Sequence, residues 1–447
     1  MLIIFRFDLV GWVIAKYNRW LGILGGLDVG VKSWIDSVDI QPSIWQENNR
    51  RWAAPQHYTC SYMAMFPPQL PHYFITRFTK LGDIVLDPFS GRGTTPIQAM
   101  SQSRFGIGND LNDLAYCLTK GKIANPNLQE ILKRLDILEG GFRRKEWMRD
   151  SGKMQPIPNK IRMIFHRETM RHLMYLRQEL DWENDDLDSF LTMVLMGAMH
   201  GSSPGFLSIS MPNTFSMSWG YVKKYIKEKN LKRPNRDVFE VLRTRCKRFL
   251  RMGELPNGGF AIHGDVRDLG VSEKISHGSV KMIFSSPPYL KVIKYGLYNW
   301  IRLWWLIGDY KIVDNKLDDA HSFENYLQFM KEVLETMLPL LNPNEGVACW
   351  VIGDVKGMNL AKEVWDNVGS NIRTKDSNGN ISGYKLLGIV EDAIQDNEKV
   401  TRIWNADEDK SGKATPIDRI LILSHENANV KSYITNNQVL WTPIVRS

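Results

Sequence analysis

The sequence predicts an α/β fold built on a doubly wound, mostly parallel sheet that is interrupted by a large helical insertion. Short β-branched and apolar runs, each ending in a turn or an acidic residue, recur in two blocks of the 447-residue chain. Segments with helical periodicity separate most of these runs, which is the alternation typical of βαβ units. Between about residues 126 and 257 the strand signals nearly vanish and helical periodicity dominates.

Seven candidate strands make up the expected sheet. They are residues 84–89, 104–110, 260–265, 280–285, 347–354, 385–390 and 417–423. Helices are expected between them at 95–101, 112–123 and 326–341, and within the insertion at 128–138, 167–180, 188–199 and 238–251. The last two strand candidates lack a clear helix between them and could pair antiparallel, and residues 375–383 are expected to form a loop.

These patterns divide the chain into four parts. We expect an N-terminal accessory segment (1–50), a sheet-forming domain (51–125 and 258–430), the helical insertion (126–257) and a C-terminal tail (431–447). The N-terminal segment is apolar but carries Arg6, Asp8, Lys16 and Arg19, so we expect neither a signal peptide nor a membrane span. It is either a helix that packs on the main domain or a non-essential extension from an upstream start codon.

Cysteine usage points to a reducing compartment and argues against a metal site. The four cysteines are scattered singly, without a Cys-x-x-Cys pair or a histidine pair to complete a zinc site; they are Cys60, Cys117, Cys246 and Cys349. We therefore expect a cytoplasmic protein with no metal and no membrane association.

The positive charge of the chain is concentrated in one part of the insertion. Residues 223–251 contain twelve basic and three acidic residues, a net charge of +9, whereas the whole chain carries +8. A run of this kind is either a solvated helix face or a phosphate-binding patch, and its share of the total charge favours nucleic-acid contact. The candidate contact residues are Lys223, Lys224, Lys227, Lys232, Arg233 and Arg236.

A glycine-containing turn follows the first candidate strand and opens a helix. Glycines at such a turn let the backbone pass close to a ligand. The third glycine of a dinucleotide-binding motif and the lysine of a P-loop are both missing, which disfavours pyrophosphate or triphosphate. A cationic ligand that carries a carboxylate suits the turn better, and its candidate ligand-binding residues are Asp87, Pro88, Phe89, Gly91, Gly93, Thr94 and Thr95.

Two more acidic residues end the neighbouring candidate strands. Asp110 lies 23 positions after Asp87, close to the spacing at which a carboxylate binds the ribose hydroxyls of a nucleoside cofactor. Asp265 ends the third strand, where it could accept a hydrogen bond from an adenine amino group. Each acid alone could be a helix N-cap, but acids at three successive strand ends favour a nucleoside pocket.

The fourth candidate strand ends in Ser285, followed by Ser286, Pro287, Pro288 and Tyr289. Two prolines fix the backbone and remove two N–H donors, so nearby carbonyl groups can face a cleft and accept hydrogens from an amino group. The Tyr289 ring could stack on a planar base. A rigid structural turn is the alternative explanation of the proline pair.

Together these motifs resemble the amino-group DNA methyltransferases. Residues 87–95 resemble their cofactor-binding motif, and residues 286–289 resemble the catalytic Ser-Pro-Pro-Tyr motif of the members that form N4-methylcytosine. Upstream, residues 65–71, with Phe66 and Pro67, resemble the segment that closes over the methionine end of the cofactor. The similarity covers roughly 57–125 and 258–424.

The resemblance implies a Rossmann-like, seven-stranded sheet of the class I methyltransferase type, S-adenosyl-L-methionine as cofactor, double-stranded DNA as partner, and cytosine N4 as target. The motif order departs from the commonest N4-cytosine layout because the glycine motif comes first, so the site of target recognition does not carry over. We assign recognition to the insertion, with residues 208–219, and to the aromatic stretch 295–305.

Alternatives remain at the level of sequence. One is the same chemistry on adenine N6 or on a guanine amine in RNA, and another is a non-catalytic DNA-binding protein on the same fold. The resemblance also leaves open whether a cognate restriction endonuclease accompanies the enzyme.

Overall fold

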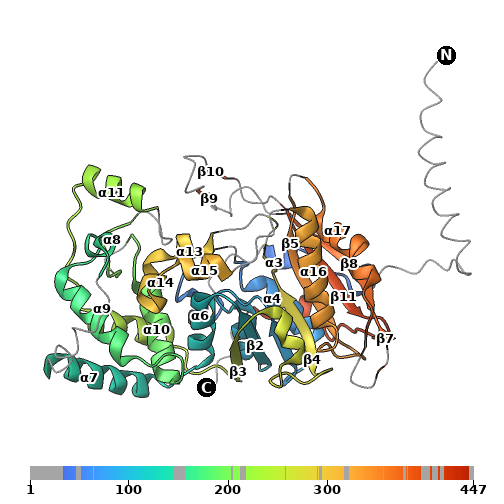
Figure 1. The fold of residues 1–447 in the computed structure, drawn as a ribbon. Coiled ribbons are helices and arrows are strands. Elements are labelled where there is room, and N and C mark those ends of the chain that lie inside the picture. The colour runs from blue at the N-terminus through green and yellow to red at the C-terminus, as the bar shows by residue number, and fades with distance from the viewer. Residues whose placement is uncertain are drawn as a thin grey trace, which may run out of the picture.

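A seven-stranded sheet forms the centre of the structure, which is a computed structural model (Figure 1). Its strands are β1 (Ile84–Asp87), β2 (Phe105–Asp110), β3 (Gly259–His263), β4 (Val280–Ser285), β5 (Val347–Gly353), β8 (Tyr384–Ala393) and β11 (Ile417–His425), in the order β3-β2-β1-β4-β5-β11-β8. Strand β11 runs antiparallel to both β5 and β8, and the other pairs are parallel. The predicted mostly parallel sheet and its antiparallel last pair are therefore confirmed, although strand ends shift by a few residues.

The structure describes most of the chain. The described residues are 34–46, 52–63, 65–144, 157–202, 205–211, 218–256, 258–288, 290, 294–316, 322–355, 357–375, 379, 381–393, 403–404, 411–412 and 417–441. Tyr289 and most of the N-terminal accessory segment lie outside these residues, as do parts of the predicted recognition stretch 208–219.

Helices cover both faces of the sheet. One face is covered by α2 (Trp34–Val38), α3 (Ser43–Gln46), α4 (Gln69–Phe78) and α5 (Thr94–Ser101), and the other by α16 (Phe323–Met337), α17 (Leu360–Asn367) and the 3-10 helix η4 (Val266–Val271). On β4, Met282 and Phe284 pack in the first layer and Ile283 in the second, as the alternation of a strand requires. Because both faces of the sheet are buried, β4 is apolar at four of its six positions, the exceptions being Lys281 and Ser285.

Short elements complete this part of the chain. They are the 3-10 helices η1 (Pro55–Tyr58), η5 (Gly369–Asn371) and η6 (Asn436–Gln438) and the two-stranded pairs β6 (Thr374–Lys375) with β7 (Ile381–Ser382) and β9 (Ile403–Trp404) with β10 (Ser411–Gly412). The stretch 375–383, expected to be a loop, thus has ends that pair as strands, with Lys375 opposite Ile381.

Among its described residues, the stretch 126–257 consists of helices and the loops that connect them, without a strand. Its helices are α7 (Leu128–Arg144), α8 (Asn159–Arg162), α9 (Arg167–Glu179), α10 (Asp186–Ala198), α11 (Trp219–Glu228) and α12 (Val238–Phe249). They lie to one side of the sheet, beyond the β3 edge (Figure 1), where α10 packs on α6 (Asp113–Ile123). Among the described residues no helix is both long and apolar enough to cross a bilayer.

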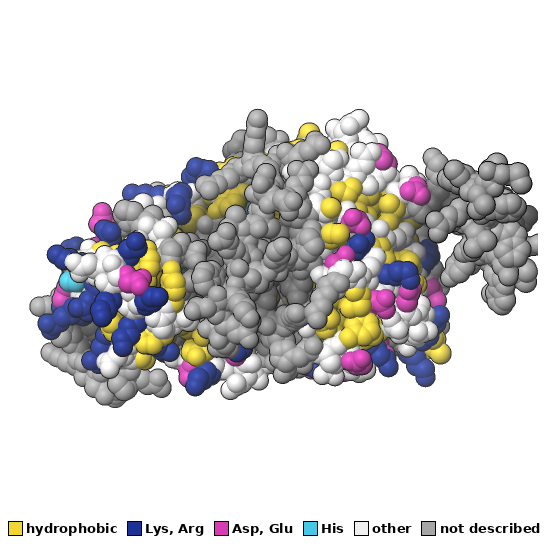
Figure 2. Space-filling model, turned by 90° about the horizontal axis from the view of Figure 1, so that it is seen from above, with side chains coloured by type: hydrophobic (Ala, Val, Ile, Leu, Met, Phe, Trp, Pro, Cys, Tyr) yellow, Lys and Arg dark blue, Asp and Glu magenta, His cyan; other side chains and the backbone are white. Residues whose placement is uncertain are grey.

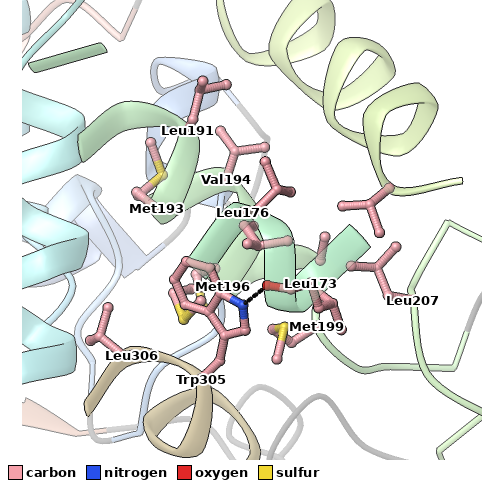
Figure 3. Close-up of a cluster of buried hydrophobic side chains, with 14 of the residues drawn as sticks. Leu173, Leu176, Leu191, Met193, Val194, Met196, Met199, Leu207, Trp305 and Leu306 are labelled. Atoms are coloured by element: carbon pink, nitrogen blue, oxygen red, sulfur yellow. Dashed lines mark hydrogen bonds between the residues drawn. The ribbon is translucent and has the colours of Figure 1, made fainter. Parts of the chain in front are cut away.

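The segment after β4 forms α13 (Tyr295–Tyr298), α14 (Trp300–Ile307) and α15 (Lys311–Lys316), and α14 packs into the helical stretch. Trp305 lies among Leu173, Leu176 and Met196, and its indole N–H donates to the Leu173 carbonyl at 2.8 Å (Figure 3). Trp300 and Trp304 are also buried. The aromatic stretch 295–305, expected to contribute to target recognition, therefore buries its tryptophans in a core, which helical periodicity alone does not distinguish from an exposed face.

One close backbone contact fastens the insertion to the segment before α4. A Cβ added at Gly197 of α10 would lie 1.9 Å from the Thr59 carbonyl oxygen. Arg302 of α14 adds a second link, because its guanidinium donates to the Met196 carbonyl at 3.0 Å and to the Ser61 hydroxyl at 3.4 Å.

We expect Gly197→Ala to destabilise the protein by about 1–3 kcal/mol, the usual cost of overpacking, because the backbone of Thr59 must move. Gly220→Ala on α11 is the matched control, since nothing lies within 4 Å of its added Cβ, and it should stabilise the helix by up to about 1 kcal/mol. Urea denaturation midpoints measure both changes. Equal midpoints for the two variants would contradict the close contact.

Candidate active site at the carboxyl ends of β1 and β4

The glycine turn between β1 and α5 adopts a conformation that requires glycine. Gly91 has φ +51° and Gly93 has φ +78°, both in the left-handed region that side chains rarely adopt. The Tyr62 ring lies 3.5 Å from the position that a Gly91 Cβ would occupy, and the Thr119 hydroxyl lies 3.0 Å from that of Gly93. Glycine is therefore required at both positions for two reasons: the positive φ angle and the close packing of neighbouring side chains.

The N–H groups of this turn are largely used within the protein. Those of Phe89 and Gly91 donate to the Asp87 and Asp110 carboxylates at 3.2 and 2.8 Å, and those of Ser90 and Gly93 donate to the Asn109 and Ser90 carbonyls at 2.8 and 2.6 Å. A phosphate site needs several free N–H groups that converge on the anion. The geometry therefore agrees with the expectation that the ligand is not a pyrophosphate.

Asp87 is a buried acid at the end of β1. Its side chain is 1% exposed and accepts hydrogen bonds from the Ser285 hydroxyl and from the Phe89 N–H. Burial raises the pKa of Asp87 from 3.8 to about 7, and the hydrogen bonds oppose that shift. A cation beside this carboxyl would favour its charged form, so Asp87 fits the cationic end of S-adenosylmethionine.

Two hydrogen bonds join the glycine turn to the strand that carries the proline pair. The Ser285 hydroxyl donates to Asp87, and the Thr95 hydroxyl of α5 donates to the Phe284 carbonyl at 3.1 Å. The parallel register of β1 with β4, which pairs Leu86 with Ile283, brings both strand ends to one edge of the sheet. Of the residues that follow, Ser286 is half-buried, Pro287 buried and Pro288 exposed.

Asp110, at the end of β2, also holds the glycine turn. Its Oδ2 accepts from the Gly91 N–H at 2.8 Å and its Oδ1 accepts from the Asn112 N–H at 2.9 Å. Burial raises the pKa of Asp110 to about 6. The structure places this acid at the end of the strand next to β1, as expected, and beside the glycine turn; its expected contact with ribose hydroxyls stays a prediction.

Asp265 is engaged in another way. It is the N-cap of η4, accepting from the Arg267 N–H at 2.9 Å, and it forms an ion pair with the Arg267 guanidinium. Hydrogen bonds from Arg267 lower the pKa of Asp265. The N-cap alternative thus describes its observed contacts, and its expected hydrogen bond to adenine stays a prediction.

The upstream segment reaches the same edge of the sheet. Phe66 packs its ring edge against Phe284, with centroids 5.5 Å apart, while Pro67 is exposed. Pro88 and Phe89 belong to the turn itself. The Phe89 ring packs against the Phe329 ring of α16, with centroids 5.8 Å apart, and the Pro88 carbonyl accepts a hydrogen bond from the Asn109 amide at 3.1 Å. Thr94, which is buried, accepts from Arg92 at 3.3 Å.

Two residues of this site were not predicted from the sequence. Asn109 donates through Nδ2 to the carbonyls of Pro88 and Gly264, both at 3.1 Å, and its buried Oδ1 has no partner among the described residues. Tyr62 stacks on Tyr295 at 5.7 Å, and its hydroxyl accepts from Asn112 at 2.9 Å. The position of Asn109 directly before a strand-ending acid was a usable signal, whereas nothing local marks the Tyr62–Tyr295 pair.

The basic run is spread over several surfaces. Lys223, Lys224 and Lys227 lie exposed on α11, where Lys224 is 3.8 Å from Glu228. Lys232, Arg233 and Arg236 lie in the loop before α12, the first two exposed and Arg236 half-buried. On α12, Arg243 pairs with Asp136 and Glu139 of α7 and is not available to a ligand. Figure 2 shows basic side chains gathered at the end of the molecule formed by the insertion.

The residues present fit the methyl donor that the resemblance implies. The turn has the close glycine backbone, a buried acid for a cationic group at Asp87, and an orphaned acceptor at Asn109 Oδ1. Among the described residues no three His, Cys, Asp or Glu side chains gather in a way that could hold a metal ion.

Part of the chain that contains this site is similar to known proteins. Residues 30–120 match the DNA methylase family. Over 135 residues the chain is 27% identical to the type II methyltransferase M.MjaII of Methanocaldococcus jannaschii, covering 30% of this chain and 25% of that protein. It is 33% identical over 85 residues to M.XycI of Xanthomonas campestris pv. cyanopsidis, covering 19% of this chain and 26% of that protein.

The matched region is a minor part of each relative, since the alignments span about a quarter of the length of these two. Among solved structures, the rRNA methyltransferase aviRa from Streptomyces viridochromogenes overlaps 89% of this chain and 97% of its own, at 10% identity and a TM-score of 0.31, which is too loose to define a shared architecture. The family match includes the glycine turn, and together with the two relatives it shows that part of this chain is similar to DNA methylases and type II methyltransferases.

Proposed function

We propose that this protein is a DNA methyltransferase that transfers a methyl group from S-adenosyl-L-methionine to an exocyclic amino group of a base, with cytosine N4 as the target. The observation that carries the proposal is the junction of β1 and β4, where hydrogen bonds from Ser285 and Thr95 hold the glycine turn beside the Ser-Pro-Pro segment. Both reacting partners would thus meet at one edge of the sheet.

The chemistry follows from the weak nucleophilicity of such an amine, whose lone pair is delocalised into the ring. In the proposed complex the Ser286 hydroxyl oxygen and the Pro287 carbonyl accept its two hydrogens, which moves the nitrogen toward tetrahedral geometry and directs its lone pair outward. The bound cofactor supplies the electrophilic methyl group. The protein contributes mainly by positioning the nucleobase. The Ser286 hydroxyl is too weak an acid to be deprotonated and serve as a general base, so the amine loses its proton to solvent after the methyl group is transferred.

The cysteines support an amine rather than a ring carbon as the acceptor. All four are buried, and none is adjacent to the proline pair in the sequence. Burial raises the pKa of Cys246 to about 12 and raises the pKa values of Cys117 and Cys349 further, so thiolate attack on a ring carbon is disfavoured at these positions.

Two features favour cytosine in DNA. Ser286 occupies the position before Pro-Pro-Tyr, as in the N4-cytosine type that the sequence resembles. DNA as the substrate is favoured by the match of residues 30–120 to a family described as DNA methylase. In a duplex the target base must leave the stack, and we assign Tyr289 to hold it once extruded.

We further propose that the helical insertion, with its exposed lysines on α11, contacts the DNA around the target. The +9 net charge of residues 223–251 is the sequence feature behind this assignment. Salt then weakens DNA binding steeply, whereas cofactor binding depends little on salt.

One assay tests the proposal. Purified protein is incubated with tritium-labelled S-adenosylmethionine and DNA, the DNA is digested to nucleosides, and the labelled nucleoside is identified. We expect the label in N4-methyl-2′-deoxycytidine. Label in N6-methyl-2′-deoxyadenosine would show that the target is adenine N6 rather than cytosine N4. Label in RNA alone would show that the substrate is RNA. DNA binding without any labelled product would show that the protein binds DNA without methylating it.

A further inference from the structure

A cavity of about 550 Å³ lies between the segment before α4 on one side and α12 with the loop before it on the other. Tyr58, Thr59 and Ser61 line one side, and Arg236, Arg245 and Arg248 are among the residues that line the other. Its size is sufficient for a nucleotide unit, since small-ligand pockets begin at about 300 Å³.

A buried guanidinium gives this cavity its positive potential. Arg245 donates to the Gly205 carbonyl at 2.9 Å and to the Gly197 carbonyl at 3.2 Å, and it lies over the Phe206 ring at 4.7 Å. Burial lowers the pKa of Arg245 only to about 10, so it stays charged at neutral pH. Because its donors go to carbonyls, its charge is not cancelled there by a carboxylate.

Arg236 brings a donor that lacks an acceptor. Its backbone is fixed on Thr169, which accepts from the Arg236 N–H at 2.9 Å and donates to its carbonyl at 2.8 Å. The side chain lines the cavity, and its Nε is buried without a hydrogen-bond partner among the described residues. A buried unsatisfied donor is costly, and an anionic oxygen at this guanidinium would offset that cost.

The acids that line the cavity leave it positive. Asp237 caps α12, accepting from the N–H groups of Phe239 at 2.8 Å and Glu240 at 3.2 Å, so its carboxylate is already engaged. Glu240 is exposed. Three arginines against these two acids leave one net positive charge in the lining.

The cavity adjoins the candidate active site through a continuous backbone. Ser61 lines the cavity, and the next residue, Tyr62, lies against the Gly91 position and stacks on Tyr295. The close contact of Gly197 with Thr59 keeps α10 and this segment at a fixed separation. A group bound in the cavity is thus held at a set position relative to the glycine turn.

We propose that this cavity binds a backbone phosphate of the DNA strand next to the extruded nucleotide, with Arg236 as its principal ligand. This inference rests on the proposed function, because it takes DNA as the substrate. Arginine suits the role because its guanidinium binds phosphate oxygens in a fixed, bidentate geometry. The exposed lysines of α11 then add sequence-independent attraction, while the cavity fixes the register of the strand.

The test compares Arg236→Gln with Arg144→Gln, which removes the same charge from the exposed end of α7, outside the cavity lining. Fluorescence anisotropy measures the dissociation constant for a duplex that the protein methylates, over a series of salt concentrations. We expect Arg236→Gln to weaken binding about tenfold and to reduce the slope of log K against log salt by about 1. Arg144→Gln should change affinity less than about twofold.

Thermal midpoints and cofactor affinity, measured on the same preparations, show that both variants are folded. Equal affinity and salt slope for Arg236→Gln and the parent would overturn the cavity assignment while leaving methylation of DNA intact. If Arg236→Gln changes the salt slope for binding of single-stranded RNA but not of the DNA duplex, the cavity binds RNA and the proposal is overturned. A parent protein that binds no DNA would overturn the proposed function and this inference together.

Discussion

Replacing Ser286 by alanine is expected to reduce the rate of methyl transfer about 10²–10³-fold at saturating cofactor and DNA, the usual cost of losing one polar group that stabilises a transition state. The hydroxyl is half-buried beside the end of β4, and in the proposed complex its oxygen accepts a hydrogen of the target amine. Cofactor affinity should stay within about threefold of the parent. Single-turnover transfer of labelled methyl, together with calorimetric binding, measures both quantities.

The neighbouring Ser285→Ala change is the matched comparison, because its hydroxyl donates to Asp87 rather than toward the proposed base site. Losing that hydrogen bond raises the pKa of Asp87 further and should weaken cofactor binding at neutral pH, with little effect on single-turnover rate once the cofactor is saturating. If Ser286→Ala transfers methyl at the parent rate, the assignment of the active site is wrong.

Cofactor affinity is expected to rise at least roughly tenfold between pH 5.5 and 7.5 and then to level off, because Asp87 must lose its proton to pair with a cation. In the free protein the pKa of Asp87 is raised to about 7, so the carboxyl is largely neutral at pH 6. Binding of a cationic ligand favours the carboxylate and releases the proton. Calorimetry in two buffers of different ionisation enthalpy counts the protons released.

Asp87→Asn is expected to bind the cofactor weakly at all pH values in this range and to lose the step near pH 7. Asp110, whose pKa is raised to about 6, should still give a smaller dependence at lower pH. Measurements stay below about pH 7.7, at which a free α-amino group would already be about half deprotonated. A parent affinity that is flat across the range would show that Asp87 does not face the cationic end.

The sign for stability is opposite to the sign for binding. An acid whose pKa is raised on folding stabilises the fold below its ordinary pKa of 3.8, and that contribution is lost as pH rises through about 7. The ligand-free protein therefore loses stability from this group at the pH where the cofactor binds best.

The sheet was predictable from the sequence because its strands are buried on both faces. Residues 280–285 are apolar except at Lys281 and Ser285, and the structure buries all six, so a short continuous run was sufficient to identify β4. The glycine turn was predictable for a different reason, since Gly91 and Gly93 occupy left-handed conformations that few other residues tolerate.

Other parts of the site depend on partners that are distant in the chain. Tyr62 meets Tyr295 only because β1 and β4 are neighbours in the sheet. The ion pair of Asp265 is local, with Arg267 two residues later, but it depends on side-chain direction, which composition does not specify. Charge counts treat a run as one surface, but the structure turns Arg243 toward α7, buries Arg245 and exposes Lys227. Side-chain direction, not residue type, separates these three.

The junction around Gly197 limits how such a protein can diversify. A target-recognition domain that is joined to a catalytic domain only by a linker can be exchanged for another such domain without disturbing the catalytic part. Here Gly197, Arg302 and Trp305 fit the insertion to the backbone at 59–61 and to α14. A transplanted insertion would have to bring both matching surfaces with it. Under the proposed contact of the insertion with DNA, new specificities should therefore arise by point changes on the exposed helices rather than by exchange of whole segments.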